Sequence, residues 1–230
     1  MSKRGAGTGA APRGPAGPRS GASSAGGRGS ARSLATALAR TAAPGEVRII
    51  GGRWKRTPLT VPDRPGLRPT GDRVRGTVFN WLTHLLGDFG AVRGLDLFAG
   101  SGALGLEAAS RGAARVTLVE RDAALARQLA ATVARLDGTG VEVVCADALA
   151  WAARQPAGSF ELVFLDPPFA AGLQAAALAA AGRLVTPAGL VYLEGPEPLA
   201  PEAATAAGYE LVRAGTAGRV AFHLLRRTGA

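Results

Sequence analysis

Cysteine and histidine are almost absent from this 230-residue chain. Cys145 is the only cysteine, which excludes an intrachain disulfide and a cysteine-rich metal site. Because His84 and His223 are the only histidines, a zinc centre is not expected, and no metal is predicted. Cys145 stands in an apolar run, which favours a small buried hydrophobe.

Long apolar runs are missing as well. No stretch approaches the roughly 20 residues that cross a membrane, and the basic N-terminus has no continuous apolar core of the signal-peptide kind. We therefore expect a reduced, cytoplasmic setting without membrane contact, and a monomer. The 47% hydrophobic content is enough for a sizeable core.

Acidic residues are scarce at one end of the chain. Residues 1–75 hold 15 Lys and Arg against 3 Asp and Glu, whereas the rest holds 12 against 14. The net charge of +10 is thus an N-terminal feature on a near-neutral body, and it suits a phosphate backbone. Residues 1–45 also have almost no large apolar side chains and are predicted to be a disordered basic leader, for which a merely solubilising role is the alternative.

Residues 46–70 are predicted to form a basic β-hairpin and loop for RNA contact. Residues 47–50 and 53–61 are the extended segments, with a turn at Gly51 and Gly52. Cations interleaved with Trp54 can hold phosphates while the indole stacks on an unpaired base. These cations are Arg48, Arg53, Lys55, Arg56, Arg64 and Arg68. The alternative is an ordinary solvated hairpin whose Trp54 packs on the body.

Residues 71–230 show the alternation of an α/β domain. A helix capped by Thr70 or Asp72 is predicted to run to about Leu86. Further helices are predicted from residue 103, over 122–136 and over 173–183, and strands over 95–98, 115–120, 141–145, 160–165 and 190–194. A hairpin of residues 209–213 and 219–226 follows. The pattern predicts a Rossmann-like, mostly parallel sheet between helix layers, closed by an antiparallel pair.

A glycine turn joins the first of these strands to its helix. Gly100, Gly102 and Gly105 match G-x-G-x-x-G, which lets a ligand lie against bare backbone at a helix N-terminus. Asp96 would repel a pyrophosphate there but attract an ammonium group. This favours S-adenosylmethionine over a nicotinamide cofactor; a glycine turn without a ligand is the remaining alternative.

Acidic residues close four of the predicted strands. Asp96, Glu120, Asp147 and Asp166 lie at or just past strand ends, which meet at one edge of a parallel sheet. Glu120 can accept both ribose hydroxyls, and Asp147 can accept the adenine amino group. Helix caps or a divalent-metal site are the alternatives, and Asp147 in particular makes a good N-cap.

The sharper signal is Asp166-Pro167-Pro168-Phe169. Two prolines after a buried strand stiffen the turn, because each lacks an N–H and fixes φ. Asp166 and the Pro167 carbonyl can then accept the hydrogens of an exocyclic base amine and stabilise the positive charge that develops on methylation. Phe169 supplies a face on which an extruded base can stack. A merely structural turn is the alternative.

The combination resembles the amino-group methyltransferases with an Asp/Asn-Pro-Pro-Phe/Tyr motif, and more specifically the bacterial 16S ribosomal RNA guanine-N2 methyltransferase family called RsmD. The similarity covers about residues 46–227. Five blocks carry it: Arg48-Ile49-Ile50-Gly51-Gly52, Gly66-Leu67-Arg68-Pro69-Thr70, Asp72-Arg73-Val74-Arg75 with Phe79-Asn80-Trp81-Leu82, the loop 98–106, and Asp166-Pro167-Pro168-Phe169.

The resemblance implies methyl transfer from S-adenosylmethionine to N2 of one guanine of 16S rRNA, in an assembled or assembling small subunit. It assigns Asp166, Pro167 and Phe169 to the target base. The implied cofactor residues are Asp96, Phe98, Gly100, Ser101, Gly102, Glu120 and Asp147. Arg68, Thr70 and Arg73 would line the entrance for RNA.

Three other functions remain open at this point. A DNA adenine-N6 methyltransferase could use the same four-residue motif. A ribosome-assembly factor could hold S-adenosylmethionine without catalysis. A nicotinamide oxidoreductase ranks last, because Asp96 disfavours its pyrophosphate.

Overall fold

The structure is a computed structural model that describes residues 46–61 and 71–229. Contacts divide the chain into two units, Met1–Thr41 and Ala42–Ala230, and all of the described residues belong to the second. The predicted leader, residues 1–45, therefore lies outside the described part. So do Arg64, Arg68 and Thr70, which fall in the stretch 62–70.

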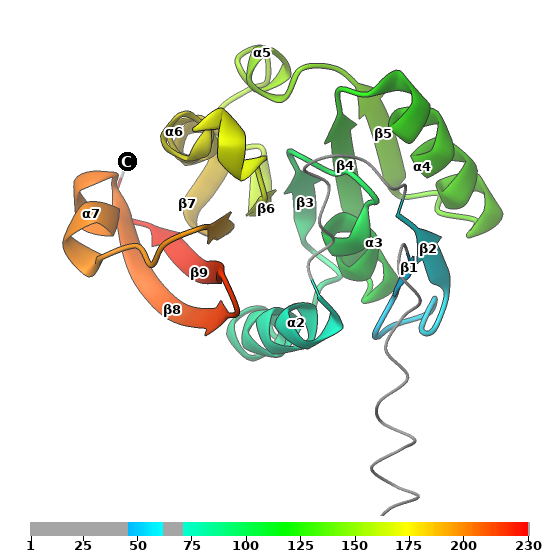
Figure 1. Cartoon of the computed structure of the whole chain (residues 1–230), viewed down its shortest axis with the longest axis horizontal. Helices are drawn as coiled ribbons and strands as arrows, with labels where there is room; N and C mark the ends of the chain where they lie inside the picture. Colours follow the sequence, from blue (N-terminus) through cyan, green and yellow to red (C-terminus); the bar gives the residue numbers. More distant parts are fainter. Residues whose placement is uncertain (1–45, 62–70, 230) are drawn as a thin grey trace, which may run out of the picture. The chain divides into compact units, whose positions relative to one another are not determined.

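Seven of the described strands form one sheet in the order β5-β4-β3-β6-β7-β9-β8 (Figure 1). The strands are β3 (Arg93–Asp96), β4 (Arg115–Glu120), β5 (Val141–Cys145), β6 (Phe160–Leu165), β7 (Val185–Gly195), β8 (Tyr209–Ala217) and β9 (Val220–Arg227). Strands β3 to β7 pair in parallel, and β9 pairs antiparallel with both β7 and β8. The predicted Rossmann-like sheet with an antiparallel C-terminal hairpin is confirmed.

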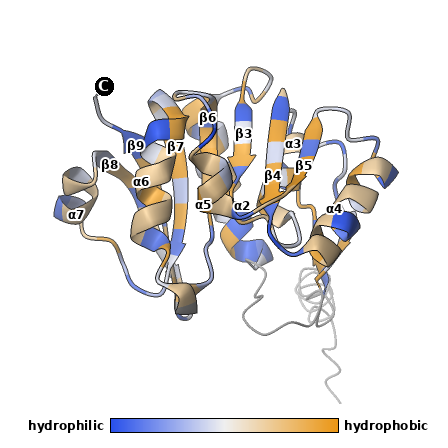
Figure 2. Ribbon diagram, turned by 90° about the horizontal axis from the view of Figure 1, so that it is seen from above, coloured by the Kyte–Doolittle hydropathy of each residue, from blue (hydrophilic) through white to orange (hydrophobic). Residues whose placement is uncertain are grey.

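Helices cover both faces of the sheet. They are α2 (Asp72–Leu86), α3 (Ala103–Ser110), α4 (Ala123–Arg135), α5 (Ala148–Ala152), α6 (Gln174–Leu184), α7 (Pro201–Ala206) and the 3-10 turn η1 (Phe169–Ala171). One apolar cluster joins α2, α3 and α4 to the sheet, and a second joins α5, α6 and α7 to the opposite face. Because the central strands are covered on both sides, their inner residues are mainly apolar, and polar residues lie towards the strand ends (Figure 2).

The N-terminal strands form the predicted antiparallel hairpin, β1 (Glu46–Arg48) with β2 (Pro58–Thr60). Both strands are shorter than predicted. The N–H groups of Ile50 and Gly51 donate to the Glu107 side chain of the sheet domain instead of to a partner strand, so regular strand pairing stops early. The inward side chains Val47 and Leu59 are buried, and the hairpin thus packs in one unit with the sheet domain.

Some local predictions were wrong. Asp72 is the first residue of α2 and not its cap, which is Gly71. Strand β3 ends at Asp96 because Leu97 and Phe98 already turn towards the glycine loop. Cys145 is exposed rather than buried, because it ends an edge strand that has only one neighbour. Among the described residues, no helix is long and apolar enough to cross a membrane.

Candidate functional site

The acidic side chains predicted to meet at one edge of the sheet do so. Chain order reverses between β3 and β6, which are neighbours although β4 and β5 separate them in sequence. Such a switch point is where open α/β sheets bind ligands, outside the carboxyl ends of the strands. Along this edge stand Asp147, Glu120, Asp96, Asp166 and Glu194, in that order. We call these five residues the acidic rim.

The glycine turn follows β3 directly and opens α3. Gly102 caps the helix with φ of +77°, a conformation that other residues rarely adopt, and its N–H donates to the Ala99 carbonyl at 2.6 Å. The Ala99 N–H in turn donates to the Val119 carbonyl at 2.9 Å, which ties the turn to β4. Phe98 and Ser101 are half-buried beside this turn. The loop is therefore held rigidly at the switch point.

Asp96 is buried beneath the glycine turn. Its side chain is 2% exposed and accepts the Gly105 N–H at 3.0 Å. Burial, reinforced by the nearby charges of Glu120 and Glu194, raises the pKa of Asp96 to about 7 in spite of the Gly105 and Phe98 N–H groups. A cation beside Asp96 would relieve this repulsion, whereas a pyrophosphate would worsen it.

Glu120 fixes the glycine turn from the neighbouring strand. One carboxylate oxygen accepts the Gly100 N–H at 2.9 Å, and the other accepts the Asp122 N–H at 2.7 Å. A carboxylate has about four lone-pair sites, so both oxygens can still accept ribose hydroxyls. The Glu120 side chain is half-buried.

Asp147 serves as the N-cap of α5, where its side chain accepts the Ala150 N–H at 2.9 Å. This matches the alternative given for Asp147 in the sequence analysis, a helix N-cap. Its carboxylate is exposed and keeps a second oxygen for an adenine amino group, so its assignment to the cofactor stays a prediction.

The Asp-Pro-Pro-Phe turn leaves β6 at the same edge. Asp96 and Phe164 are paired in register, and the Leu97 N–H donates to the Phe164 carbonyl at 3.2 Å, so this turn starts beside the glycine loop. Asp166 is half-buried, Pro167 is buried, and Phe169 is 38% exposed. Among the described residues, Phe169 is the only exposed large hydrophobic side chain. An exposed ring three residues after Asp166 suits an extruded base.

Glu194 was missed by sequence reasoning, although it closes a predicted strand and so carried the same signal as the other acids. Leu165 and Leu193 pair in register, which places Glu194 on the strand beside Asp166. Glu194 is 3% exposed and accepts the Tyr192 hydroxyl at 2.6 Å. Burial, Glu194 and Asp166 raise the pKa of Tyr192, which keeps its hydroxyl a hydrogen-bond donor to the rim.

The hairpin carries its predicted cations outward. Arg53, Lys55 and Arg56 of the hairpin and Arg73 of α2 are exposed, and within the described residues no carboxylate pairs with them. Arg48 is exposed too, but it pairs with Glu46 at 3.0 Å. Exposed basic side chains of this kind are the chief contacts to phosphates in nucleic-acid binding.

Trp54 does not support the predicted stacking role. Its side chain is 8% exposed within the apolar cluster of α2 to α4, and the Arg53 guanidinium lies 4.2 Å from the ring centroid. An indole covered in this way cannot receive a base on either face. The structure thus matches the alternative, in which Trp54 packs on the body.

S-adenosylmethionine fits these residues. The buried carboxylate with a raised pKa is suited to an ammonium group, and Glu120 retains acceptor capacity. Asp96, Gly100 and Gly102 would hold its amino-acid part, and Glu120 with Asp147 its nucleoside part. Among the described residues, no group of three or more potential ligands could hold a metal ion.

A glycine turn and an acidic rim on this sheet define the Rossmann-like methyltransferase class, and the comparisons agree. A solved structure of an Escherichia coli protein described as a methyltransferase superposes with a TM-score of 0.68 at 41% identity, covering 81% of this chain and all of that one. A Haemophilus influenzae protein described as a methylase gives 0.64 at 35% identity, covering 80% of this chain and all of its own.

The family is shown by sequence. The chain belongs to the family described as conserved hypothetical protein 95, whose model matches residues 47–226. It is 43% identical over 189 residues to the "Ribosomal RNA small subunit methyltransferase D" of Escherichia coli strain K12, covering 80% of this chain and 91% of that protein. The predicted resemblance is therefore confirmed.

Proposed function

We propose that this protein methylates the exocyclic N2 amine of one guanine in 16S rRNA, with S-adenosylmethionine as the donor. The observation that carries the proposal is the juxtaposition, at the switch point, of Asp166 and Pro167 with the glycine turn and Asp96. The name of the relative at 43% identity supports ribosomal RNA of the small subunit as the substrate. We further propose that the reaction takes place in the cytoplasm on an assembled or assembling small subunit, and that the protein acts as a monomer.

S-adenosylmethionine, when bound, supplies a methyl group on a positively charged sulfur. The Asp166 carboxylate and the Pro167 carbonyl accept the two N2 hydrogens of the guanine, which directs the nitrogen lone pair away from its ring. As N2 gains a fourth bond it becomes positive, and the Asp166 carboxylate stabilises that charge and accepts the proton that leaves. Phe169 offers its exposed ring to the guanine face.

The rigidity of the turn supports this role. Pro167 is buried, and two prolines in succession restrict the backbone that aims Asp166. Glu194 and Tyr192 stand beside it in a largely dry environment. A carboxylate held in this way needs little reorganisation when positive charge develops, which is the main source of electrostatic catalysis.

The test follows a labelled methyl group. Small ribosomal subunits that lack the modification, naked 16S rRNA and duplex DNA are each incubated with labelled S-adenosylmethionine and then digested to nucleosides. We expect N2-methylguanosine from RNA, with the subunit preferred. Label in adenine of DNA would overturn the proposal in favour of an adenine-N6 methyltransferase.

A pair of variants tests the catalytic assignment. Asp166→Ala removes the acceptor, and we expect kcat to fall by about 10²- to 10⁴-fold. Asp166→Asn keeps one acceptor oxygen and should retain part of the activity. The dissociation constant of S-adenosylmethionine, measured by calorimetry, should stay unchanged in both. Full turnover by Asp166→Ala would contradict the assignment, and no turnover by the wild type would favour a non-catalytic assembly factor.

A further inference from the structure

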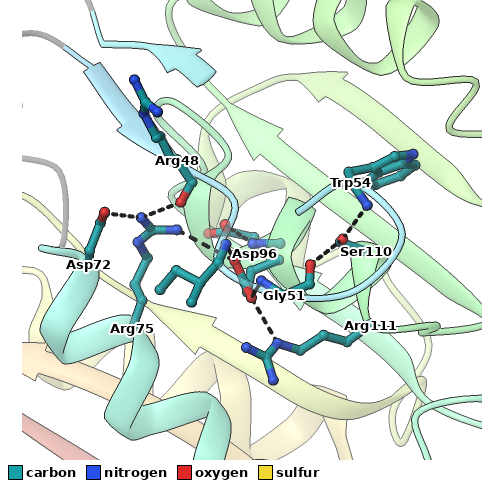
Figure 3. Close-up of polar contacts among 11 residues, drawn as sticks. Arg48, Gly51, Trp54, Asp72, Arg75, Asp96, Ser110 and Arg111 are labelled. Atoms are coloured by element: carbon teal, nitrogen blue, oxygen red, sulfur yellow. Dashed lines mark hydrogen bonds and ion pairs between the residues drawn. The ribbon is translucent and has the colours of Figure 1, made fainter. Parts of the chain in front are cut away.

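A buried carboxylate that the proposed chemistry does not use lies in the middle of α3. Glu107 is fully buried, and an ionised carboxylate in that position is costly unless it is paired and hydrogen-bonded. Its oxygens accept the Ile50 N–H at 2.6 Å and the Gly51 N–H at 2.8 Å (Figure 3). Both donors belong to the hairpin, more than 50 residues away in sequence. Glu107 therefore ties two distant parts of the chain together.

Two arginines complete the environment of Glu107. The Nε of Arg111, the C-cap of α3, donates to Glu107 at 2.8 Å. The Arg75 Nη1 lies 3.7 Å from the other Glu107 oxygen, and Arg75 also donates to the Arg48 carbonyl at 2.7 Å and pairs with Asp72. Arg75 is fully buried like Glu107. Helix α2, helix α3 and the end of β1 thus meet at one carboxylate.

The last turn of α3 holds the hairpin by further contacts. The Ser110 hydroxyl donates to the Gly51 carbonyl at 2.6 Å and accepts the Trp54 N–H at 2.9 Å. The Ser110 carbonyl accepts the Arg53 N–H at 2.8 Å. Gly52 has φ of +72°, and a Cβ there would overlap the Ser110 carbonyl, so only glycine permits this approach. The turn of the hairpin is thus built onto the end of α3.

The opposite end of α3 carries the glycine turn. Gly102 caps the helix, and the Gly105 N–H binds Asp96, only two residues before Glu107. A helix of eight residues is about 12 Å long. One short rigid element therefore connects the predicted cofactor site to the hairpin that carries Arg53, Lys55 and Arg56.

We propose that Glu107 is a positioning residue, which fixes the basic hairpin relative to Asp166 so that RNA held by the hairpin presents its target base to the rim. The inference rests on the function proposed above. Glu107 touches neither the acidic rim nor the exposed cations, so it acts through the orientation of the hairpin. Its loss should weaken productive RNA binding while cofactor binding and chemistry persist.

Glu107→Gln is the direct test. Gln has a single acceptor oxygen, and its amide NH₂ would face an N–H of Ile50 or Gly51. With small ribosomal subunits as substrate, we expect KM to rise at least about 10-fold and kcat to stay within about threefold. The dissociation constant of S-adenosylmethionine should stay within about twofold of the wild-type value. Hydrogen exchange should accelerate in residues 46–61 and stay unchanged in residues 95–106.

Glu161→Gln is the matched control. Glu161 also accepts a backbone N–H, that of Arg93 at 2.8 Å, and an arginine side chain, but it lies at the edge of the sheet opposite the rim. This variant should keep the wild-type KM. Should Glu107→Gln not fold, Ser110→Ala removes two contacts of the same hairpin turn and should raise KM in the same direction by a smaller factor.

The outcomes separate the two proposals. If the wild type transfers no methyl group to the subunit, the proposed function fails. The positioning role of Glu107 is tested only if the wild type is active. It is then wrong if the folded variant, Glu107→Gln or its substitute Ser110→Ala, keeps the wild-type KM. It is also wrong if that variant has a lowered kcat at saturating RNA or a weakened affinity for the cofactor. Unchanged exchange in residues 46–61 would contradict it independently of any activity.

Discussion

Two carboxylates of the acidic rim, those of Asp96 and Glu194, are buried, whereas the cations of the hairpin are exposed to water. Asp96 and Glu194 are at most 3% exposed, and Asp96 has a pKa raised to about 7. Lys55 and Arg56 are exposed and unpaired within the described residues. Charges in a dry site interact strongly and are little screened, while exposed charges interact weakly and are screened by salt. Changes at the buried carboxylates of the rim should therefore have large effects, and changes in the hairpin small, cumulative effects that depend on salt.

The largest effect is expected at Asp96. Asp96→Asn keeps an oxygen for the Gly105 N–H but removes the charge that would face the ammonium group of S-adenosylmethionine. We expect the dissociation constant to rise by about 10²-fold or more, as for one partner removed from a buried charge pair. Calorimetry measures it. Asp147→Asn is the control, because Asn also caps helices and Asp147 is exposed, so its effect should be far smaller. Equal effects of the two would break the contrast between buried and exposed charges.

The same variant should stabilise the protein in the absence of the cofactor. The raised pKa of Asp96 means that the folded state keeps a proton between about pH 4 and pH 7, whereas the unfolded state has lost it. Stability contributed by this group is thus lost as pH rises through that window. We expect Asp96→Asn to raise Tm at pH 8 and to have little effect at pH 4. A lower Tm at pH 8 would contradict the raised pKa.

A pH dependence of cofactor affinity should follow. Below about pH 7 Asp96 holds its proton, so affinity for the ammonium group should fall by up to about tenfold per pH unit. Above about pH 8 the α-amino group of S-adenosylmethionine loses its own charge, and affinity should fall again. Calorimetry from pH 5.5 to pH 9 measures the profile. The acid limb should disappear in Asp96→Asn; its persistence would assign the titration to another group.

The hairpin should respond to salt rather than to pH. Lys55→Ala and Arg56→Ala are each expected to raise KM for the small subunit by a few fold, and each should reduce the slope of log affinity against log salt by about 1. Arg154→Ala, an exposed arginine after α5, is the control and should change neither quantity. An unchanged slope would show that the hairpin cations do not meet phosphates.

The smallest effect on RNA is expected at Trp54. Trp54→Phe keeps an aromatic side chain but leaves a gap in the core. The free energy of unfolding should therefore fall by roughly 1–3 kcal/mol, and Tm should fall with it. KM for the subunit should stay within about twofold, because the buried ring does not contact a base. A large rise in KM at unchanged Tm would restore the stacking role.

The main elements of the fold were predictable because their patterns are local. Strands β4, β5 and β6 have the predicted bounds, since their apolar runs are short and flanked by polar residues or turns. Helix α4 begins at its predicted Asp122 cap. The short helices α5 and α7 were not predicted, because Ala-rich segments carry little signal in a chain so rich in alanine.

The sequence by itself determined which residues follow each strand, and therefore which acids and glycines share an edge once the strands lie parallel. Only the tertiary structure decided what covers each side chain. Trp54 is buried and Cys145 is exposed against expectation, and Glu107 meets Ile50 and Gly51 across more than 50 residues of chain. The physical reason is that strand and helix patterns are set by neighbours in sequence, whereas burial, ion pairing and the pKa of Asp96 are set by neighbours in space.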